Sequence, residues 1–210
     1  MLFICKHKTT PMSLKSILAV LLMAAGLHPF AQKAYKDSIK AYQKKYIADL
    51  EAVIKKDTAH IRFYPISPSF KITAQVELLK DQPVFKMTTS SGKTKEAQKY
   101  ALVKFTYAGK AYQLYAYQLL ALKSKAETAN LFFIPFMDKT SGNESYGGGR
   151  YIDFEIKDIV QNKLVIDFNK AYNPYCAFTT GYNCPVPPRE NVLELTVKAG
   201  ERYLAEKFGH

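Results

Sequence analysis

The spacing of hydrophobic positions changes once along the chain, near residue 57. Before that point, residues 33–56 contain neither proline nor glycine, and apolar or aromatic side chains recur at every third or fourth position. These side chains are Tyr35, Ile39, Tyr42, Tyr46, Leu50 and Val53. Such spacing places them along one stripe of an α-helix, with lysines and acids on the opposite face. We therefore predict an amphipathic helix over residues 33–57, packed across one side or end of the domain that follows.

From residue 58 onward, hydrophobic side chains alternate with polar ones, and turn-forming residues such as Ser91-Gly92 and Gly109-Lys110 separate the alternating runs. This pattern predicts seven or eight short strands. The clearest are residues 70–79, 83–89, 100–107, 111–120, 130–136, 150–156 and 163–168. Because no internal repeat or linker interrupts them, residues 58–210 are predicted to form one mainly β domain. The expected fold is a single antiparallel β-sandwich or partly open barrel with an N-terminal amphipathic helix.

Residues 1–32 have the features of a secretory signal peptide. Lys6, Lys8 and Lys15 precede or flank an apolar run at residues 17–27, and Ala31 offers a cleavage point. Met12 is an alternative start, because the sequence from that residue is already a complete leader. An uncleaved anchor is disfavoured, since a membrane span needs about 20 apolar residues. We expect an exported protein, periplasmic or extracellular, with no stable membrane span after signal cleavage.

The charge balance is basic. Residues 1–32 hold three of the 30 basic residues and none of the 18 acids, so the remainder carries a formal charge of +9. An excess of this size can favour anionic partners. The lysines, however, are scattered and form no nucleic-acid-binding pattern. We therefore predict no nucleic-acid partner; the oligomeric state is not indicated.

Cysteines and histidines restrict the possible chemistry. Cys176 and Cys184 remain after the leader, and an even pair in an oxidising compartment predicts a disulfide. Their spacing is not that of a zinc site and no histidine lies nearby, so no metal site and no cofactor are predicted. Outside the leader and the terminal residue, His60 is the one remaining histidine. Ser-His-Asp and Cys-His hydrolysis are excluded unless His60 folds onto the site.

Two stretches, residues 133–155 and 166–191, hold most of the residues that could carry chemistry. In the first, a glycine triplet ends at Gly149 and is followed by Arg150. The triplet could form an anion-binding nest or could simply turn the chain. Arg150 could clamp a carboxylate or phosphate, or it could neutralise Asp153 and Asp167, which is the interpretation we favour.

The acids can be placed by the alternation of apolar positions. If residues 151–156 and 164–169 pair as a hairpin, their apolar faces must coincide, and Asp153 then lies across from Asp167 or Asn169. Two facing carboxylates need a cation, a shared proton or Arg150 to compensate their charges. In the alternative, Asp167 accepts hydrogen bonds from backbone amides of the turn at residues 169–173 and never meets solvent.

The same stretches carry a family resemblance. Their motifs are PFMDKTSGNESYGGGRY (135–151), DFNKAYNPYCAF (167–178), CPVPPREN (184–191) and AGE (199–201). They resemble those of the bacterial and archaeal family called domain of unknown function 1684, over roughly residues 60–203. Met137 and Phe178 depart from the family pattern, which weakens any role for these two positions. The resemblance implies kinship and marks the important stretch, but it implies no activity.

We predict a pocket for a small polar or anionic ligand, built from the GGGRY and DFNxAYNPxC segments. Its candidate residues are Arg150, Asp153, Asp167, Asn169, Tyr172, Asn173, Asp138 and Tyr146. One alternative is a non-catalytic envelope or interaction module in which these residues are structural. Another is a hydrolase that uses the carboxylates as acid and base, so the question of an enzyme stays open. Burial separates the first two: an open cleft with convergent polar groups favours binding, and a satisfied interior network favours structure.

Overall fold

The computed structural model describes residues 14–208, with side chains for residues 30–55 and 58–208. The chain divides into two compact units, one ending at Ser38 and the other spanning residues 39–210. The predicted leader, residues 1–32, lies partly outside the described residues and stays a prediction. Among the residues that the structure describes, no helix is both long and apolar enough to cross a membrane.

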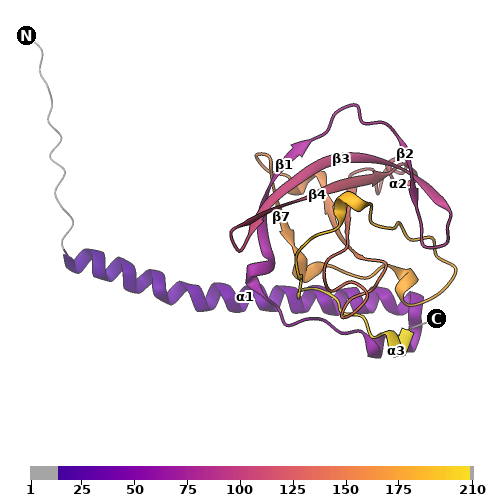
Figure 1. Ribbon diagram of the computed structural model, residues 1–210. Helices are drawn as coiled ribbons and strands as arrows, with labels where there is room; N and C mark the ends of the chain where they lie inside the picture. Colours follow the sequence, from indigo (N-terminus) through magenta and orange to yellow (C-terminus); the bar gives the residue numbers. More distant parts are fainter. Residues whose placement is uncertain (1–13, 209–210) are drawn as a thin grey trace, which may run out of the picture. The chain divides into compact units, whose positions relative to one another are not determined.

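All seven predicted strands are present. They are β1 (Lys71–Leu78), β2 (Phe85–Thr88), β3 (Thr94–Tyr107), β4 (Lys110–Leu119), β5 (Leu131–Phe136), β6 (Arg150–Glu155) and β7 (Lys163–Asp167). Their order in the sheet is β6-β5-β4-β3-β1-β7, every pairing is antiparallel, and β2 adds to β3 outside this path. The six strands in the path form a nearly closed barrel, which confirms the barrel alternative over the sandwich (Figure 1).

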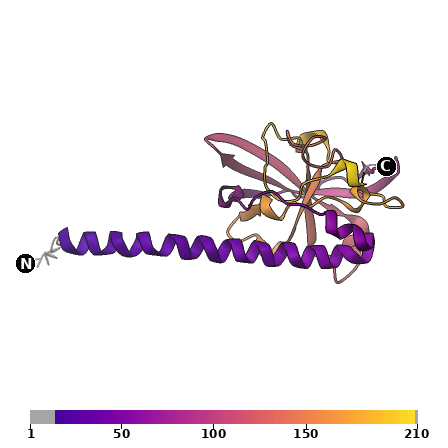
Figure 2. The ribbon, with the colours of Figure 1, turned by 90° about the horizontal axis from the view of Figure 1, so that it is seen from below.

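The helices are α1 (Leu14–Ile54), α2 (Leu120–Lys123) and α3 (Ala205–Phe208). Short 3-10 turns lie between the other elements: η1 (Lys55–His60), η2 (Pro68–Phe70), η3 (Ile156–Asp158), η4 (Phe168–Lys170), η5 (Tyr175–Ala177) and η6 (Arg189–Asn191). After α1 the chain turns through η1 and runs back toward β1 (Figure 2). The predicted helix is confirmed, and Ile39 and Leu50 of its apolar stripe are each only 1% exposed.

The predicted hairpin of β6 and β7 is wrong. These strands lie at opposite ends of the sheet: β6 pairs with β5, and β7 pairs with β1. A tight turn does form at residues 160–163, where Gln161 and Asn162 have positive φ. The 3-10 turn η3 follows β6 directly, however, so the chain leaves the line of β6 before it reverses. Asp153 therefore lies opposite Phe133, and Asp167 lies opposite Lys71.

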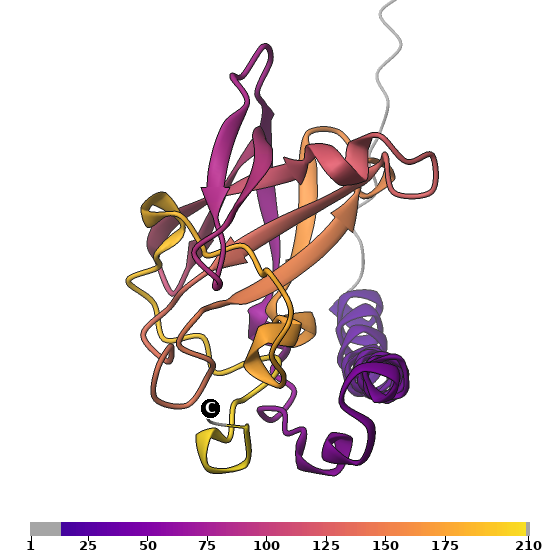
Figure 3. The ribbon, with the colours of Figure 1, turned by 90° about the vertical axis from the view of Figure 1, so that its right-hand side faces the viewer.

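One pair of tyrosines closes the barrel. Tyr151 of β6 and Tyr172, which follows β7, exchange two backbone hydrogen bonds of 2.9 and 3.1 Å. They join the two end strands of the sheet through the segment after β7. The part of α1 that begins at Ile39 lies beside this segment, and the Tyr42 hydroxyl donates to the carbonyl of Lys170 at 3.1 Å (Figure 3). The helix thus covers the seam of the barrel.

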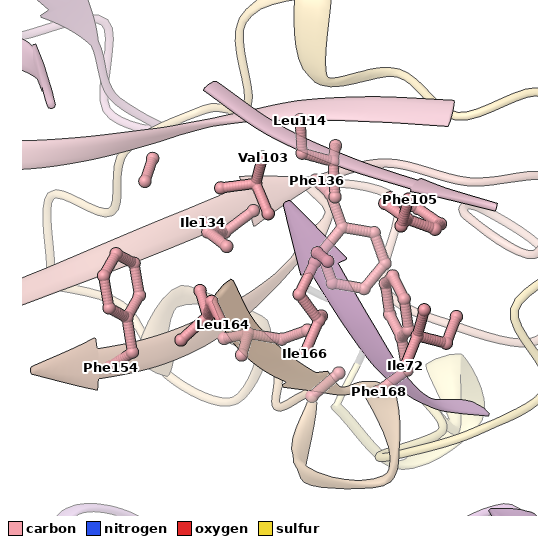
Figure 4. Close-up of a cluster of buried hydrophobic side chains, with 14 of the residues drawn as sticks. Ile72, Val103, Phe105, Leu114, Ile134, Phe136, Phe154, Leu164, Ile166 and Phe168 are labelled. Atoms are coloured by element: carbon pink, nitrogen blue, oxygen red, sulfur yellow. The ribbon is translucent and has the colours of Figure 1, made fainter. Parts of the chain in front are cut away.

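The core lies inside the barrel, where the apolar faces of the strands meet (Figure 4). Ile134, Phe136 and Phe168 are at its centre and have no exposed side-chain surface. A second cluster lies at the end of α1, where Leu50 and Ile54 pack with residues of the segments around Phe178 and Phe208. The first cluster stabilises the barrel, and the second holds the helix against it.

Gly149 serves packing and backbone conformation. Its φ is +84°, which is strained for any residue with a side chain. A Cβ atom there would lie 2.5 Å from Cγ of Pro187 and 2.7 Å from the carbonyl oxygen of Phe136. Gly149 therefore lets β6 approach both segments closely, which favours the turn-forming alternative for the glycine triplet.

We expect Gly149→Ala to destabilise the fold more than Gly142→Ala. Both glycines have a φ of +84°, but an added Cβ at Gly142 meets no atom within 4 Å. The common backbone strain costs about 1–2 kcal/mol, and overpacking adds about 1–3 kcal/mol at Gly149 alone. Urea unfolding of both variants measures the difference; equal losses of stability would show that close approach does not matter at Gly149.

Candidate functional site

Arg150 is buried completely and is used inside the protein. One terminal nitrogen, Nη1, donates to the carbonyls of Ala199 (2.6 Å) and Glu201 (3.2 Å). The other, Nη2, donates to Oδ1 of Asp138 and to the carbonyl of Val197, both at 3.0 Å. The predicted pairing of Arg150 with Asp153 and Asp167 is wrong. Residues 150 and 153 are three positions apart on β6, so their side chains point to opposite faces of the strand.

Asp138 completes this interior network. Its carboxylate accepts hydrogen bonds from the Arg150 guanidinium, from the hydroxyl of Thr140 (2.9 Å) and from the backbone amide of Val197 (2.7 Å). Both charged side chains have no solvent exposure. Such a pair is tolerated because hydrogen bonds replace most of the lost water on both partners, although Nε of Arg150 has no hydrogen-bond partner among the described residues. Asp138 and Arg150 therefore connect the loop after β5, the start of β6 and the C-terminal segment.

Three other candidates also hold loops together. Oδ1 of Asp167 accepts from the backbone amide (3.1 Å) and the side-chain amide (3.0 Å) of Asn169, which confirms the turn-stabilising alternative for Asp167. Asn169 in turn exchanges two 2.8 Å hydrogen bonds with the backbone of Ser67. Asn173 is fully buried, and its side chain donates to the carbonyl of Arg202 at 3.0 Å.

The predicted disulfide joins Cys176 and Cys184. Closing a loop of this length contributes about 2–3 kcal/mol in the chain-entropy model. Tyr146, a partly buried candidate, packs edge-on against Tyr203 at 5.1 Å between ring centroids, and its hydroxyl donates to the carbonyl of Cys176 at 3.4 Å. Tyr146 therefore contacts the disulfide loop.

Asp153 and Tyr172 lie elsewhere, in an open depression of about 290 Å³ that we call the helix recess. Its walls come from α1 on one side and from β6 and the segment after β7 on the other. The lining residues are Tyr42, Lys45, Tyr46, Asp49, Leu50, Asp153, Tyr172 and Tyr175. Of the eight predicted residues, the structure thus brings two into an open site.

Three tyrosines of the recess donate their hydroxyl hydrogens to acceptors of the protein. Tyr172 donates to Oδ2 of Asp153 and Tyr46 donates to Oε2 of Glu201, each at 2.8 Å, while Tyr42 donates to a backbone carbonyl. Burial raises the pKa of all three hydroxyls, and nearby carboxylates raise these pKa values further. The three side chains are therefore neutral at physiological pH.

Asp153 is the acid that faces this recess. Asp153 is exposed at the recess; desolvation by the neighbouring protein atoms raises the pKa of its carboxyl to about 6, and the hydrogen bond from Tyr172 opposes that rise. Within the described residues, Tyr172 is the one side chain that donates to this carboxylate, and it uses Oδ2. Oδ1 of Asp153 therefore remains able to accept a hydrogen bond from a ligand.

Glu201 lies under Tyr46 and was not among the predicted site residues, although it belongs to the AGE motif. It is fully buried, which raises the pKa of its carboxyl to about 8 despite hydrogen bonds from Asn173 and Tyr46. Oε2 accepts from Tyr46 and from the backbone amide of Asn173 (2.7 Å). Oε1 of Glu201 and Oδ1 of Asn173 are both buried acceptors without a partner among the described residues. A buried carboxylate oxygen without a donor disfavours the charged form, which agrees in direction with the raised pKa of Glu201.

A second depression of about 350 Å³, the disulfide recess, shares Tyr172 and Tyr175 with the helix recess. Its other walls are Lys95, Tyr151, Pro174, Tyr182, Asn183, Cys184 and Pro185. Tyr175 and Tyr182 pack edge-on at 5.1 Å between ring centroids. No group of three or more histidine, cysteine or acidic side chains within the described part of the chain is arranged to hold a metal ion.

The fold and this site define a small antiparallel barrel with a helix-covered seam and a buried Arg–Asp pair at its base. The chain belongs to the family described as Protein of unknown function (DUF1684), whose model matches residues 56–202. The solution NMR structure of an uncharacterized protein from Haloarcula marismortui is similar, with a TM-score of 0.63 and 26% sequence identity. That similarity covers 82% of this chain and 96% of the other. No curated protein matches the chain.

We expect Arg150→Met to cost about 3–5 kcal/mol of folding stability, because it leaves the buried Asp138 carboxylate without its counter-charge. Lys139→Met is the matched control: Lys139 also pairs with an acid, Glu194, at 3.1 Å, but both side chains are more than half exposed. That change should cost less than about 1 kcal/mol. Equal unfolding midpoints for the two variants in guanidinium chloride would contradict a structural role for Arg150.

Glu201 should make stability fall as pH rises. At pH values between the ordinary glutamate pKa of about 4.3 and the folded Glu201 pKa of about 8, the native state holds up to one more proton than the unfolded state. Unfolding free energy then decreases by up to about 1.4 kcal/mol per pH unit, or about 2 kcal/mol from pH 6.5 to 8.0. Asp153, whose folded pKa is about 6, contributes a slope of the same sign mainly below pH 6.5.

Glu201→Gln keeps the shape and supplies a permanent donor, so it should remove this slope. Urea unfolding of both proteins at pH 6.5 and 8.0 measures it. A wild-type slope retained in the glutamine variant would show that Glu201 is ionised in the native protein.

Proposed function

We propose that this chain is a small-ligand-binding domain whose ligand occupies the helix recess. The observation that supports this is the division among the motif residues. Four of them make interior hydrogen bonds, and none of the four lines the helix recess: Arg150, Asp138, Asn169 and Asn173. Asp153 and Tyr172 instead line an open recess, where a carboxylate oxygen is left over.

The size and lining of the recess suit a small molecule. Ligand pockets are typically about 300–1,000 Å³ and combine aromatic walls with a few polar groups. The helix recess is at the lower end of that range, and its neighbour, the disulfide recess, continues it past the rings of Tyr172 and Tyr175. A metabolite-sized ligand fits the first recess, and a longer one would extend into the second.

A hydrolase that uses two carboxylates has less support. Asp138 and Asp167 accept hydrogen bonds from the protein and do not line the recess. Asp49 does line it, but its carboxylate pairs with Lys45 at 2.6 Å. Binding therefore accounts for the site better than acid–base catalysis does.

We also propose that the protein is exported. The leader-like residues 1–32 support this, and so does the Cys176–Cys184 disulfide, because such bonds persist in oxidising compartments. The oxidised loop forms one wall of the disulfide recess.

Thermal-shift screening of the full chain against metals, sugars, nucleotides, organic acids and amines should find stabilising compounds, since binding to the folded state raises its melting temperature. We expect NMR signals of residues around Asp153 and Tyr172 to move with each true ligand. Asp153→Asn should weaken binding, whereas Asp81→Asn, an exposed acid in a distant turn, should leave it unchanged.

Tyr175→Leu provides a second recess variant at an exposed position in case Asp153→Asn affects folding. Two results would contradict the proposal. One is binding that none of the recess variants changes. The other is a set of NMR shifts confined to a different open groove, which is lined by residues of β3, β4 and the segment 190–194. Shifts confined to that groove would favour an interaction module.

A further inference from the structure

We infer that the ligand of the helix recess is an organic cation that presents an alkylammonium group to Asp153. This inference rests on the proposed function and names the chemical class that the recess accepts. It follows from three features of the lining: its hydrogen-bonding direction, its charge and its aromatic surface.

The polar groups of the recess accept hydrogen bonds and have few hydrogens to offer. A tyrosine hydroxyl has one hydrogen, and Tyr42, Tyr46 and Tyr172 each direct theirs to an acceptor of the protein. Their oxygens, together with Oδ1 of Asp153, can therefore only accept from a ligand. The other polar side chains of the lining are Lys45, which pairs with Asp49, and the exposed Tyr175, so the side of the recess at Asp153 matches a ligand that donates at its polar end.

The charge of the lining has the sign that a cation needs. Lys45 and Asp49 face each other at 2.6 Å across one turn of α1 and cancel. Asp153 is then the one lining acid without a cationic partner among the described residues. Glu201 lies beneath Tyr46, is fully buried and does not line the recess. Lys45, Asp49 and Asp153 thus give the lining one net negative charge, and Lys170 is a cation outside the lining, next to Tyr42.

The walls of the recess are aromatic faces. The rings of Tyr46 and Tyr172 are 5.8 Å apart at an angle of 48°, and Tyr42 and Tyr175 extend the lining. Aromatic faces attract ammonium groups within about 6 Å of the ring centroid. The protein itself provides an example, because Nζ of Lys170 lies 5.4 Å from the centroid of Tyr42. An ammonium group of a ligand would meet the same kind of surface where the rings of Tyr46 and Tyr172 line the recess.

An anionic ligand meets the opposite conditions. Arg150 is fully buried and its terminal nitrogens already donate to the protein, so it offers nothing to the recess. Lys45 is the one cation of the lining, and binding an anion there would release the charge of Asp49 next to it. The expectation of an anionic ligand depended on Arg150, and Arg150 does not line the recess.

The test compares n-butylammonium with two molecules of similar shape, the neutral butan-1-ol and the anionic butyrate. Each is titrated into the full chain at pH 7.5 and followed by NMR, with binding placed by the shifts of residues around Tyr172. We expect the ammonium ion to bind at least about tenfold more tightly than the alcohol, because it makes a charge-assisted hydrogen bond. Butyrate should not bind in the recess.

Asp153→Asn should reduce the preference for the cation over the alcohol to less than about threefold, because an amide carries no charge. Asp81→Asn should leave it intact. Lowering the pH to 5 should also weaken cation binding in the wild type, since Asp153 then takes up a proton. The charged and titratable groups around Asp153 are Tyr151, Tyr172 and Tyr175, then Tyr42, Lys45, Tyr46 and Asp49 from α1, with Lys170 next to Tyr42.

The outcomes separate the two proposals. If butan-1-ol or butyrate shifts the recess signals as strongly as the ammonium ion, the cation assignment is wrong and ligand binding stands. If the preference persists in a folded Asp153→Asn protein, Asp153 is not the recognition group and the inference is also wrong. If no compound of the screen or the titrations reaches the recess, both the inference and the proposed function fail.

Discussion

The buried guanidinium of Arg150 sets the position of every other part of the site. Removing such a charge from water is costly, and it is compensated here only because three carbonyls and the Asp138 carboxylate converge on it. Those carbonyls belong to residues 197–201, so the C-terminal segment must lie against β6. This placement brings the Glu201 side chain under Tyr46, and Tyr46 fixes the helix over the seam. The helix recess exists because these contacts follow one from another.

The residues of the family motifs therefore have two roles, interior hydrogen bonding and lining the recess, and the order of these residues along the chain does not separate the two. Most of their polar residues join distant loops through interior hydrogen bonds, as Asn169 does with Ser67 and Asn173 does with Arg202. Of the predicted site residues, Tyr172 and Asp153 line the open recess, although each lies close in sequence to a buried candidate. A list of motif residues thus mixes structural and exposed positions, and burial is what separates them.

The alternation of apolar positions was enough to place the strands, because it is a local property of extended chain. It could not identify the partners of each strand, since it determines which face a side chain takes and not which strand lies alongside. The hairpin of β6 and β7 was wrong for that reason. The opposite directions of Arg150 and Asp153 could have been predicted from their three-residue spacing on one strand. The recess could not, because five of its eight lining residues come from a helix whose docking depends on Glu201, and the AGE motif does not indicate that Glu201 contacts a helix.

The wall that α1 contributes has an evolutionary consequence. Lys45 and Asp49 line the recess, are exposed, and form their ion pair only with each other. They also lie before residue 56, where the match to the family begins. Substitutions at these two positions leave the barrel, its seam and the Arg150 network untouched. Selection could therefore change what the recess admits by altering one face of a helix, while the constraints on folding stay within the barrel.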